Sequence, residues 1–522
     1  MTYYITTPLF YVNDLPHIGS AYPTIAADFF AGHMIQRGED VAFLTGTDEH
    51  GQKIEKAAAA NNKSPQEHCD FIAEEFKKLW KILDINYDYF IRTSTASHRQ
   101  FVTEFFQKVR ANGDIYKGQY TGLYCTHCED FWLEKDLIEE GKTFLCPTHK
   151  KAVEEYSQEN YFFALSKYQD KLQKYIDDNP DFISPDYRKN EVIGWLKDGL
   201  RDFPISRANL SWGIPVPGDT EEQVIYVWFD ALLGYLSGLG ADKDKFWQDD
   251  SVVHIIGKDI LRFHAVYWPA MLMSAGLPLP KKVFGHGFLT KDGMKMGKTL
   301  GNIIDPIALA EEFGAEAVKF YFLREIMFGK DGDYTDESFI QRLNSDLANN
   351  LGNLLNRSLK LISKYFDNKI PNAEVDPQIK QNFSGLELSF KKHIDELNPY
   401  AALEELFKAL DQVNVLINDV APWKILKDES ATEQSRNQAA RSLVSSVYAC
   451  RQAAIYLAPI MPNISKQIFT NLGIATADLK RDKLLNNIFN LSRLQESMVG
   501  LTVLAEPQAI FSRLEKKEKT SV

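Results

Sequence analysis

The sequence predicts an α/β protein: a parallel sheet that is interrupted by an insertion and followed by an all-helical domain. Three observations lead to this prediction. Strand-like apolar runs alternate with helical periodicity over residues 1–113 and again over residues 216–283. Between these parts, residues 114–215 are dominated by cysteines, charges and aromatics, and the alternation lapses. From residue 344 to residue 522 nearly the whole chain has amphipathic helical spacing, which predicts a bundle.

The first part begins with a βαβ unit. A strand is predicted for the apolar, β-branched run YYITTPLFYV, and the polar stretch Asn13 to Pro16 ends it. Helical periodicity then extends over residues 26–35 and stops at Gly38. A second buried strand is predicted for VAFLTGTD. Strands joined in this way run parallel, and open α/β sheets bind ligands at the polar carboxyl ends of their strands.

After the insertion, strand-then-helix patterns return in QVIYVWFDALLGYL and in VVHIIGKDILRFHAVYWPAML. Residues 284–343 form a further region. It opens with the hairpin-like stretch FGHGFLTKDGMKMGKTLGN, which we expect to turn at Asp292-Gly293. A helix should follow from Asp305 as N-cap and Pro306 as first residue, and Gly314 should end it.

Composition and charge limit the functional classes. The 522 residues carry a net charge of −12, which argues against sequence-blind binding to polyanions but permits a local basic face that meets RNA. No apolar run is long enough to span a membrane, and the first residues have no basic leader pattern, so we expect a cytoplasmic protein. Two of the five cysteines, Cys69 and Cys450, are isolated and are expected to be buried apolar residues.

The remaining cysteines belong to two pairs of metal-ligand side chains. Two residues separate Cys125 from Cys128, and two separate Cys146 from His149. Three thiolates and one imidazole complete a tetrahedral zinc site and leave no position for water. The sequence therefore predicts one structural zinc ion per chain, with His127 as a bystander.

Two short motifs suit a triphosphate, although each is weak alone. His17 follows Pro16 at a predicted helix start, where N–H groups and a partial positive charge favour phosphate, and Gly19 permits close approach of the backbone. Lys295 and Lys298 lie on a glycine-containing loop, and two mobile ammonium groups suit transient phosphate charge. Taken singly, the first motif is more often a packed histidine at a helix start, and the second is more often a solvated run of surface charge.

In this order the motifs resemble the ATP-binding pair of the class I aminoacyl-tRNA synthetases, which have a Rossmann-like catalytic sheet. The second histidine of that family is replaced by Ser20, and its loop serines by Gly297 and Thr299. We expect activity to be retained. The resemblance narrows to the bacterial type of methionyl-tRNA synthetase in the stretches TTPLFYVNDLPHIG, FLTGTDEHG, YVWFDALLGY, GKDILRFHAVYWPAM and KMGKT, which follow the family order over essentially the whole chain.

The resemblance implies activation of methionine by ATP with Mg²⁺, and then transfer to tRNA(Met). Asp48 would pair with the α-ammonium group. The thioether slot would be lined by Leu9, Tyr11, Trp228, Tyr235, Ile260 and His264. His17, Lys295 and Lys298 would be catalytic, and the ATP site would comprise His17, Gly19, Ser20, His286, Gly287, Lys295 and Lys298. Asp259 and Arg207 also match family positions near the reacting groups. Apart from the resemblance, Trp228 and Tyr235 would suit an ordinary core.

The same resemblance assigns a role to the bundle. Leu347, Leu351, Leu354, Leu355 and Ile362 fall on one helical face, opposite Asn353, Arg357, Lys360 and Lys364. Asn353 and Arg357 match the family pair that reads the anticodon, and Trp423 matches a second anticodon element. Core packing is the alternative for Trp423. The zinc-bearing insertion would guide the tRNA acceptor end. A β-rich dimerisation extension is not evident, so we expect a monomer.

Three alternatives remain open. The first is a class I synthetase for leucine or isoleucine, although those chains are usually longer and carry a large editing insertion. The second is a tRNA-binding paralogue without catalysis, against which His17, Asp48, Lys295 and Lys298 argue. The third is a smaller nucleotidyltransferase that shares the ATP motifs, for which the bundle and the metal ligands would be unexplained.

Overall fold

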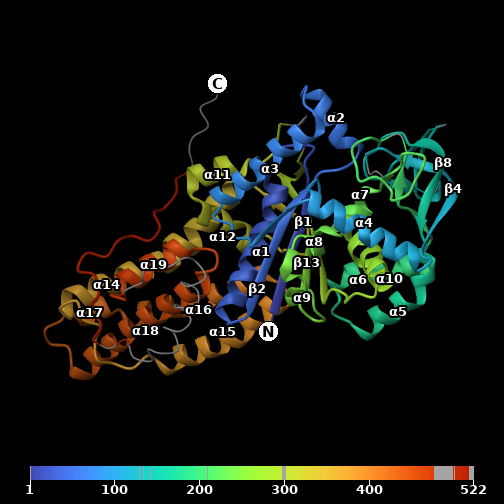
Figure 1. The fold of residues 1–522 in the computed structure, drawn as a ribbon. Coiled ribbons are helices and arrows are strands. Elements are labelled where there is room, and N and C mark those ends of the chain that lie inside the picture. Colours follow the sequence, from blue (N-terminus) through green and yellow to red (C-terminus); the bar gives the residue numbers. More distant parts are fainter. Residues whose placement is uncertain are drawn as a thin grey trace.

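A six-stranded parallel sheet lies at the centre of the protein, in the order β3-β2-β1-β13-β14-β9 (Figure 1). The computed structural model describes residues 2–127, 130–132, 134–141, 143–208, 210–296, 301–474, 498 and 500–515. Every neighbouring pair in this sheet is parallel. The strands are β1 (Thr2–Tyr11), β2 (Asp40–Asp48), β3 (Tyr89–Arg92), β9 (Ile183–Ser184), β13 (Val252–Gly257) and β14 (Lys282–His286). The predicted α/β class is confirmed.

The first βαβ unit has the predicted order. Helix α1 (Ile18–Gln36) joins β1 to β2, and nearly all of its side chains are buried because further helices cover the face turned away from the sheet. At the point where β1 and β2 end, Leu9 pairs with Gly46 and Tyr11 with Asp48. The helices that follow β2 and β3 are α2 (Gln52–Ala60), α3 (Pro65–Ile82) and α4 (Ala96–Ala111).

The segment between the two halves of the sheet contains its own antiparallel sheet, in the order β10-β8-β4-β5. Its strands are β4 (Ile115–Cys125), β5 (Asp130–Trp132), β8 (Glu154–Phe163) and β10 (Phe203–Pro204), beside the short pair β6 (Ile138–Glu140) and β7 (Thr143–Leu145). The same stretch of sequence also contains α5 (Gln169–Asp178), β9 and α6 (Asp186–Lys197). Because β9 pairs with β14, residues 114–215 both form an added sheet and extend the central one.

The run QVIYVWFDALLGYL differs from its prediction. Only β12 (Val224–Ile225) is a strand there, and it pairs with β11 (Ser206–Arg207) outside the central sheet. The rest forms the short buried helices α7 (Val227–Ala231) and α8 (Gly234–Ser237). A short apolar run suits a buried helix as well as a buried strand, so hydrophobicity could not separate the two. The second predicted unit is correct: β13 leads into η4 (Lys258–Ile260), the π-helical turn η5 (Phe263–Tyr267) and α10 (Trp268–Ala275).

The hairpin and the helix that follows it are confirmed. Strands β15 (Leu289–Lys291) and β16 (Met294–Lys295) are antiparallel, and both Asp292 and Gly293 have positive φ in the turn between them. Helix α11 (Pro306–Phe313) begins after Asp305, whose carboxylate accepts two backbone N–H bonds, and ends at Gly314. The elements that follow are α12 (Ala315–Glu325), β17 (Gly332–Tyr334) and α13 (Asp336–Arg342).

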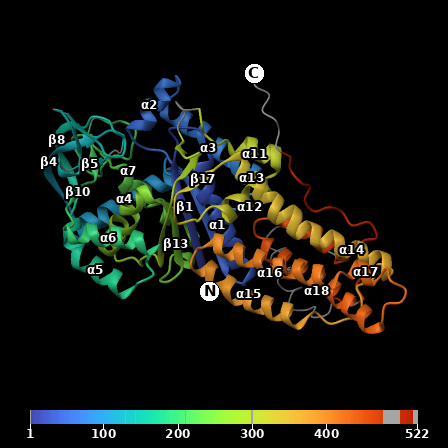
Figure 2. The ribbon, with the colours of Figure 1, turned by 180° about the vertical axis from the view of Figure 1, so that it is seen from behind.

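The helical bundle extends from one side of the sheet, and the insertion sheet lies on the other side (Figure 2). The bundle comprises the π-helical segment η7 (Leu343–Gly352) and the helices α14 (Asn353–Tyr365), α15 (Pro377–Asp395), α16 (Pro399–Val420), α17 (Pro422–Ile425), α18 (Glu433–Leu457) and α19 (Pro462–Asn471). Residues 500–515 return along the bundle, and Ile370 donates a backbone hydrogen bond to Leu501.

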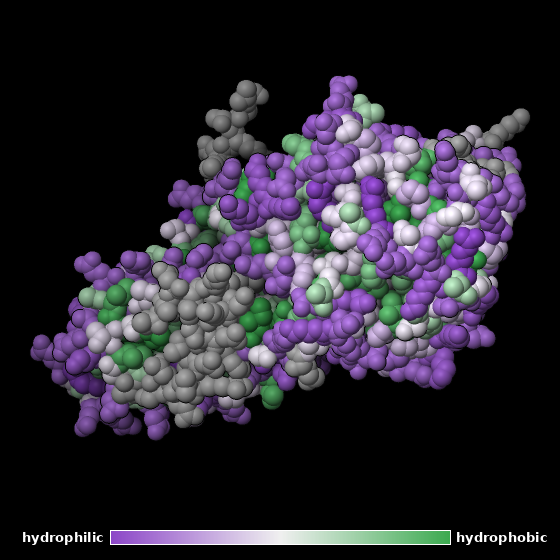
Figure 3. Space-filling model, viewed as in Figure 1, coloured by the Kyte–Doolittle hydropathy of each residue, from purple (hydrophilic) through white to green (hydrophobic). Residues whose placement is uncertain are grey.

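The face seen in Figure 3 is largely hydrophilic, and its hydrophobic residues form small separate patches. Among the described residues, no helix combines the length and the apolarity that a membrane crossing requires.

Candidate active site and nucleic-acid interface

His17 caps the helix that points at the proposed phosphate site. It is the N-cap residue of α1, and its Nδ1 accepts a 3.0 Å hydrogen bond from the backbone N–H of Gly19. Since Nδ1 is the acceptor, the proton of the neutral ring is on Nε2. The His17 side chain is exposed, and a ring with its proton on Nε2 has the chemistry to donate to a phosphate oxygen. A Cβ at position 19 would meet the His17 ring at 2.7 Å, so the ring could keep this position only with glycine there.

Ser20, which replaces the second family histidine, completes this cap. Its hydroxyl accepts from the backbone N–H of His17 at 3.1 Å and donates to the carbonyl of His17 at 2.8 Å. The side chain is buried. The serine therefore stabilises the helix start and the position of His17, as expected for a capping box.

His286 and Gly287 lie at the carboxyl end of β14, beside α1. The His286 ring is buried and packs edge-to-face against Tyr22 of α1 at 5.8 Å. Burial lowers the pKa of His286 to about 4, so the ring is neutral at pH 7. A side chain on Gly287 would overlap the backbone of Lys330 at 2.1 Å, so this close approach of two loops requires glycine.

Lys295 ends the hairpin and is exposed. It lies close enough to the exposed Asp259 of η4 for its charge to act on that carboxylate. Partial desolvation raises the Asp259 pKa, and the positive charges of Lys258 and Lys295 oppose that rise. The hairpin thus brings one predicted catalytic lysine to the carboxyl edge of the sheet. Lys298, together with Gly297 and Thr299, lies outside the described residues.

The predicted amino-acid pocket is assembled at the same edge. Asp48 is 2% exposed at the end of β2, and its charge contributes to the raised pKa of Tyr235, for which burial is the main cause. Leu9 packs so closely on α8 that a side chain at Gly234 would meet it at 2.6 Å. Strands β1 and β2 and helix α8 therefore bring together Leu9, Tyr11, Asp48 and Tyr235.

A hydrogen-bonded chain crosses the pocket. Nδ1 of His264 donates to the carbonyl of Ile260 at 3.0 Å, which leaves Nε2 to accept from the Tyr235 hydroxyl at 2.8 Å. Burial lowers the pKa of His264 to about 4. The polar groups of this cage are therefore neutral and paired with one another, which suits an uncharged thioether.

The aromatic part of the pocket includes residues that sequence reasoning missed. Trp228 stacks on Phe263 with ring centroids 4.0 Å apart, and it meets the His264 ring edge-on. Behind Tyr235 lies His254, which accepts from Trp268 at Nε2 and hydrogen bonds Thr6 through Nδ1. Two features of the sequence could have indicated these residues. Phe263 is adjacent to the predicted pocket residue His264, and His254 is a polar residue within an apolar strand.

Arg207 lies on β11, where the chain returns from the insertion. Its guanidinium stacks over Tyr226 at 4.0 Å and lies 5.6 Å from the ring of Tyr124 on β4. It also donates to the carbonyl of Ser206 at 2.8 Å. The arginine is thus held between the insertion sheet and the helices that form the pocket.

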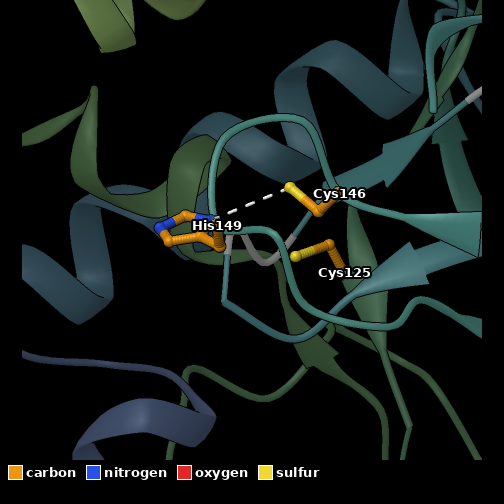
Figure 4. A group of neighbouring side chains, drawn as sticks. All are labelled: Cys125, Cys146 and His149. Carbon is orange, nitrogen blue, oxygen red and sulfur yellow. Dashed lines mark hydrogen bonds between the residues drawn. The ribbon is translucent and has the colours of Figure 1, made fainter. Parts of the chain in front are cut away.

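The predicted metal ligands converge. The ligand atoms of Cys125, Cys146 and His149 all lie within 4.8 Å of one another (Figure 4). Both cysteines are buried, and the sulfur of Cys146 is 3.9 Å from Nδ1 of His149. Cys128 lies outside the described residues. Two thiols and one imidazole at this spacing have the donor chemistry of a zinc site.

The predicted anticodon residues share one hollow of 310 Å³ at the far end of the bundle. Its lining residues are Asn353, Asn356, Arg357, Lys360, Leu361 and Trp423. The Arg357 guanidinium lies 5.1 Å from the Trp423 ring centre and donates to Asn418 at 3.1 Å. Trp423 is only half-buried. The buried and exposed faces of α14 agree with the predicted helical wheel.

Comparisons with known proteins agree with this arrangement. The family described as tRNA synthetases class I (M) matches residues 3–154 and 133–359. A methionine–tRNA ligase of Nostoc sp. is 46% identical over 99% of this chain and 98% of its own length. That of Thermosynechococcus vestitus is 48% identical over 90% of this chain and 89% of its own.

A solved structure is similar to this chain in both sequence and fold. Methionyl-tRNA synthetase of Mycobacterium tuberculosis in complex with methionyl-adenylate is 38% identical, with a TM-score of 0.90 over 98% of this chain and all of that one. The fold and the two ATP motifs thus define a class I aminoacyl-tRNA synthetase. Within this class, the chain belongs to the methionine–tRNA ligase family.

Proposed function

We propose that this chain joins L-methionine to ATP, forming methionyl-adenylate and pyrophosphate, and then transfers methionine to the 3′ end of tRNA(Met). One observation carries the proposal: the carboxylate of Asp48, the neutral Tyr235–His264 cage and the His17 cap meet at one edge of the sheet. The carboxylate suits an ammonium group. The uncharged aromatic cage suits a thioether, which gains both apolar burial and sulfur–aromatic contact.

In the first step, an oxygen of the methionine carboxylate attacks the α-phosphorus of ATP. The bond from that phosphorus to the bridging oxygen breaks, and pyrophosphate leaves with the electron pair. Nε2–H of His17 would donate to the phosphates, while Lys295 and Lys298 would neutralise the charge that builds on them. Mg²⁺ would enter with ATP and supply further neutralisation. Positioning and charge stabilisation thus account for the chemistry.

The amino-acid dependence of ATP–pyrophosphate exchange tests this function, with each amino acid supplied singly and without tRNA. We expect exchange with methionine and little with leucine or isoleucine, because their branched side chains differ in shape from the unbranched thioether and lack its sulfur–aromatic contact. Exchange with leucine or isoleucine would instead support the alternative substrate. If no amino acid supported exchange, the chain would be a tRNA-binding paralogue without catalysis.

We propose that Cys125, Cys128, Cys146 and His149 hold one structural zinc ion that stabilises the insertion. Elemental analysis of the freshly purified protein should give about one zinc per chain. The double variant Cys125→Ala, Cys146→Ala should contain almost none and should unfold at a lower temperature. Cys69→Ala, which removes an isolated buried thiol, is the matched control and should keep its zinc. A wild type without zinc would contradict the proposal.

We propose that the hollow on the bundle reads the CAU anticodon of tRNA(Met). Stacking of a base on an aromatic side chain is worth about 1–3 kcal/mol. Trp423→Ala should therefore lower kcat/KM for tRNA charging by about 10- to 100-fold, while tRNA-independent pyrophosphate exchange stays near the wild-type rate.

The control for Trp423 is Lys424→Ala, because the next residue is exposed and does not line the hollow. This variant should charge tRNA nearly as well as the wild type. Equal losses of charging and exchange in Trp423→Ala would indicate that the tryptophan acts in folding instead.

A further inference from the structure

A buried cluster behind the amino-acid pocket is not explained by the mechanism above. The carboxylate of Asp230 contacts two histidines: its Oδ2 lies 2.6 Å from Nδ1 of His50, and its Oδ1 lies 2.6 Å from Nε2 of His98. Nδ1 of His98 continues the chain to the hydroxyl of Ser237, also at 2.6 Å. The side chains of Asp230, His50 and His98 are at most 1% exposed. We call the chain His50–Asp230–His98–Ser237 the buried frame.

The positions of the protons in the buried frame follow from the hydrogen-bond partners of its residues. A carboxylate can only accept, so both histidines donate to Asp230. Nε2 of His50 faces a guanidinium nitrogen of Arg99 at 3.4 Å, which can only donate, and Nδ1 of His98 can accept from Ser237. Both rings are therefore complete as neutral tautomers. Although burial opposes ionisation, the two histidines lower the pKa of Asp230 to about 2.

Three residues of the buried frame each lie two positions after a residue of the amino-acid pocket. His50 follows Asp48 by two positions, Asp230 follows Trp228 by two on α7, and Ser237 follows Tyr235 by two on α8. The third helix, α4, carries His98. Figure 1 shows α4, α7 and α8 beside the carboxyl half of β1. The frame therefore connects the ammonium ligand to the two aromatic residues of the thioether cage.

The turn that carries Asp48 is also held from the other side. Glu49 is fully buried, accepts from Arg92 at 2.7 Å and receives the Thr47 hydroxyl at 2.6 Å. Its backbone N–H donates to Thr93 at 2.8 Å. With Glu49 held by this group and His50 held by the frame, the residues after Asp48 have little freedom.

We propose that His50, Asp230, His98 and Ser237 are positioning residues that set the separation between Asp48 and the aromatic cage. The proposal rests on the proposed function, in which Asp48 binds the α-ammonium group of methionine and the aromatic cage binds its thioether. We call these two groups the poles of methionine. Apolar side chains could fill the same volume without the desolvation penalty of a buried charge. Hydrogen bonds are directional, so a chain of them fixes the separation between Asp48 and the aromatic cage more closely than apolar packing does. Its effect should be confined to ligands that engage both poles.

The test uses two inhibitors that differ only in the α-ammonium group: methioninol and 4-(methylthio)butan-1-ol. Inhibition constants are measured in methionine-dependent pyrophosphate exchange. Asp230→Ala should weaken methioninol about 10-fold or more and should change binding of the deaminated alcohol less than about 3-fold, because only methioninol needs both poles aligned. The KM for methionine should rise in parallel, and the KM for ATP should stay nearly constant.

Asp230→Asn is the rescue variant. Its amide oxygen can still accept from His50, and its N–H₂ can donate to His98 if that ring shifts its proton to Nδ1 and Ser237 accepts it. Methioninol binding should therefore return to within about 3-fold of the wild type. The matched control is Asp114→Ala. It removes another buried carboxylate, bonded to Tyr168 and Ser274, and should lower thermal stability without changing either inhibition constant.

Equal losses for both inhibitors in Asp230→Ala, or no loss for either, would overturn the positioning role. If Asp230→Ala does not fold, Ser237→Ala decides instead, with a loss of about 3-fold expected for methioninol and no change for the deaminated alcohol. A wild type without methionine-dependent exchange would overturn the proposed function and this inference together. Wild-type exchange without selective loss in the variants would overturn the inference alone.

Discussion

Lys295→Ala should lower the maximal rate of methionine-dependent pyrophosphate exchange by about 10²- to 10³-fold, as expected when one donor to developing charge is removed. The ammonium group of Lys295 stands at the end of the β15–β16 hairpin, near Asp259 at the carboxyl edge of the sheet. Its charge matters most when pyrophosphate is leaving. The KM for methionine should therefore change little, since the amino-acid pocket does not include this lysine.

The control is Lys291→Ala, because Lys291 belongs to the same hairpin and pairs with Met294. It removes an equal charge from the same element and should keep more than half of the exchange rate. A similar loss in both variants would mean that the hairpin contributes only a general positive potential. A rise in the KM for methionine, with the maximal rate unchanged, would contradict the catalytic role of Lys295.

Asp48→Asn should raise the KM for methionine about 30-fold or more, because truncation of one partner of a buried charge pair costs about 2–5 kcal/mol. Asp48 is almost fully buried at the end of β2, so water cannot take the place of its carboxylate in stabilising the substrate ammonium group. Asparagine keeps the shape of the side chain but leaves the substrate ammonium without a counter-charge. Exchange kinetics at varied methionine and fixed ATP measure the effect.

Asp40→Asn is the matched control at the opposite end of the same strand. Asp40 is exposed and pairs with Lys245 at 2.7 Å, a surface contact that is worth little. Its KM for methionine should equal that of the wild type. If Asp48→Asn lowered the maximal rate and left the KM unchanged, Asp48 would act on the transition state and would not bind the ground-state ammonium.

The start of the chain shows how much of the fold could be predicted. Alternation and turn residues correctly placed β1, α1 and β2, because each has a strong periodic signal and a clear break. The Asp292-Gly293 turn was correct for the same reason. The run around Trp228 was predicted as a strand and a helix but forms mostly short helices, since complete burial removes the periodicity that separates the two.

Site residues were predictable where a short spacing carries the chemistry. Cys125, Cys146 and His149 do converge, as ligand spacing and thiol chemistry indicated. The roles of the predicted site residues, Cys128 and Lys298 among them, and the monomeric state stay predictions. Ser20 was treated as a substitution in the ATP motif; the structure shows that its hydroxyl closes the cap of α1. That use depends on backbone geometry, which a motif does not contain.

The sequence by itself determined the class of the protein, the order of its elements and the chemical types gathered at the site. These properties depend on local periodicity and on short motifs. Only the tertiary structure decided which distant groups meet. The pairing of His50, His98 and Asp230, the neutral state of His264 and the return of β9 to the central sheet each depend on contacts between segments far apart in the chain. Burial and hydrogen-bond partners set protonation and position, and both arise only when those segments pack together.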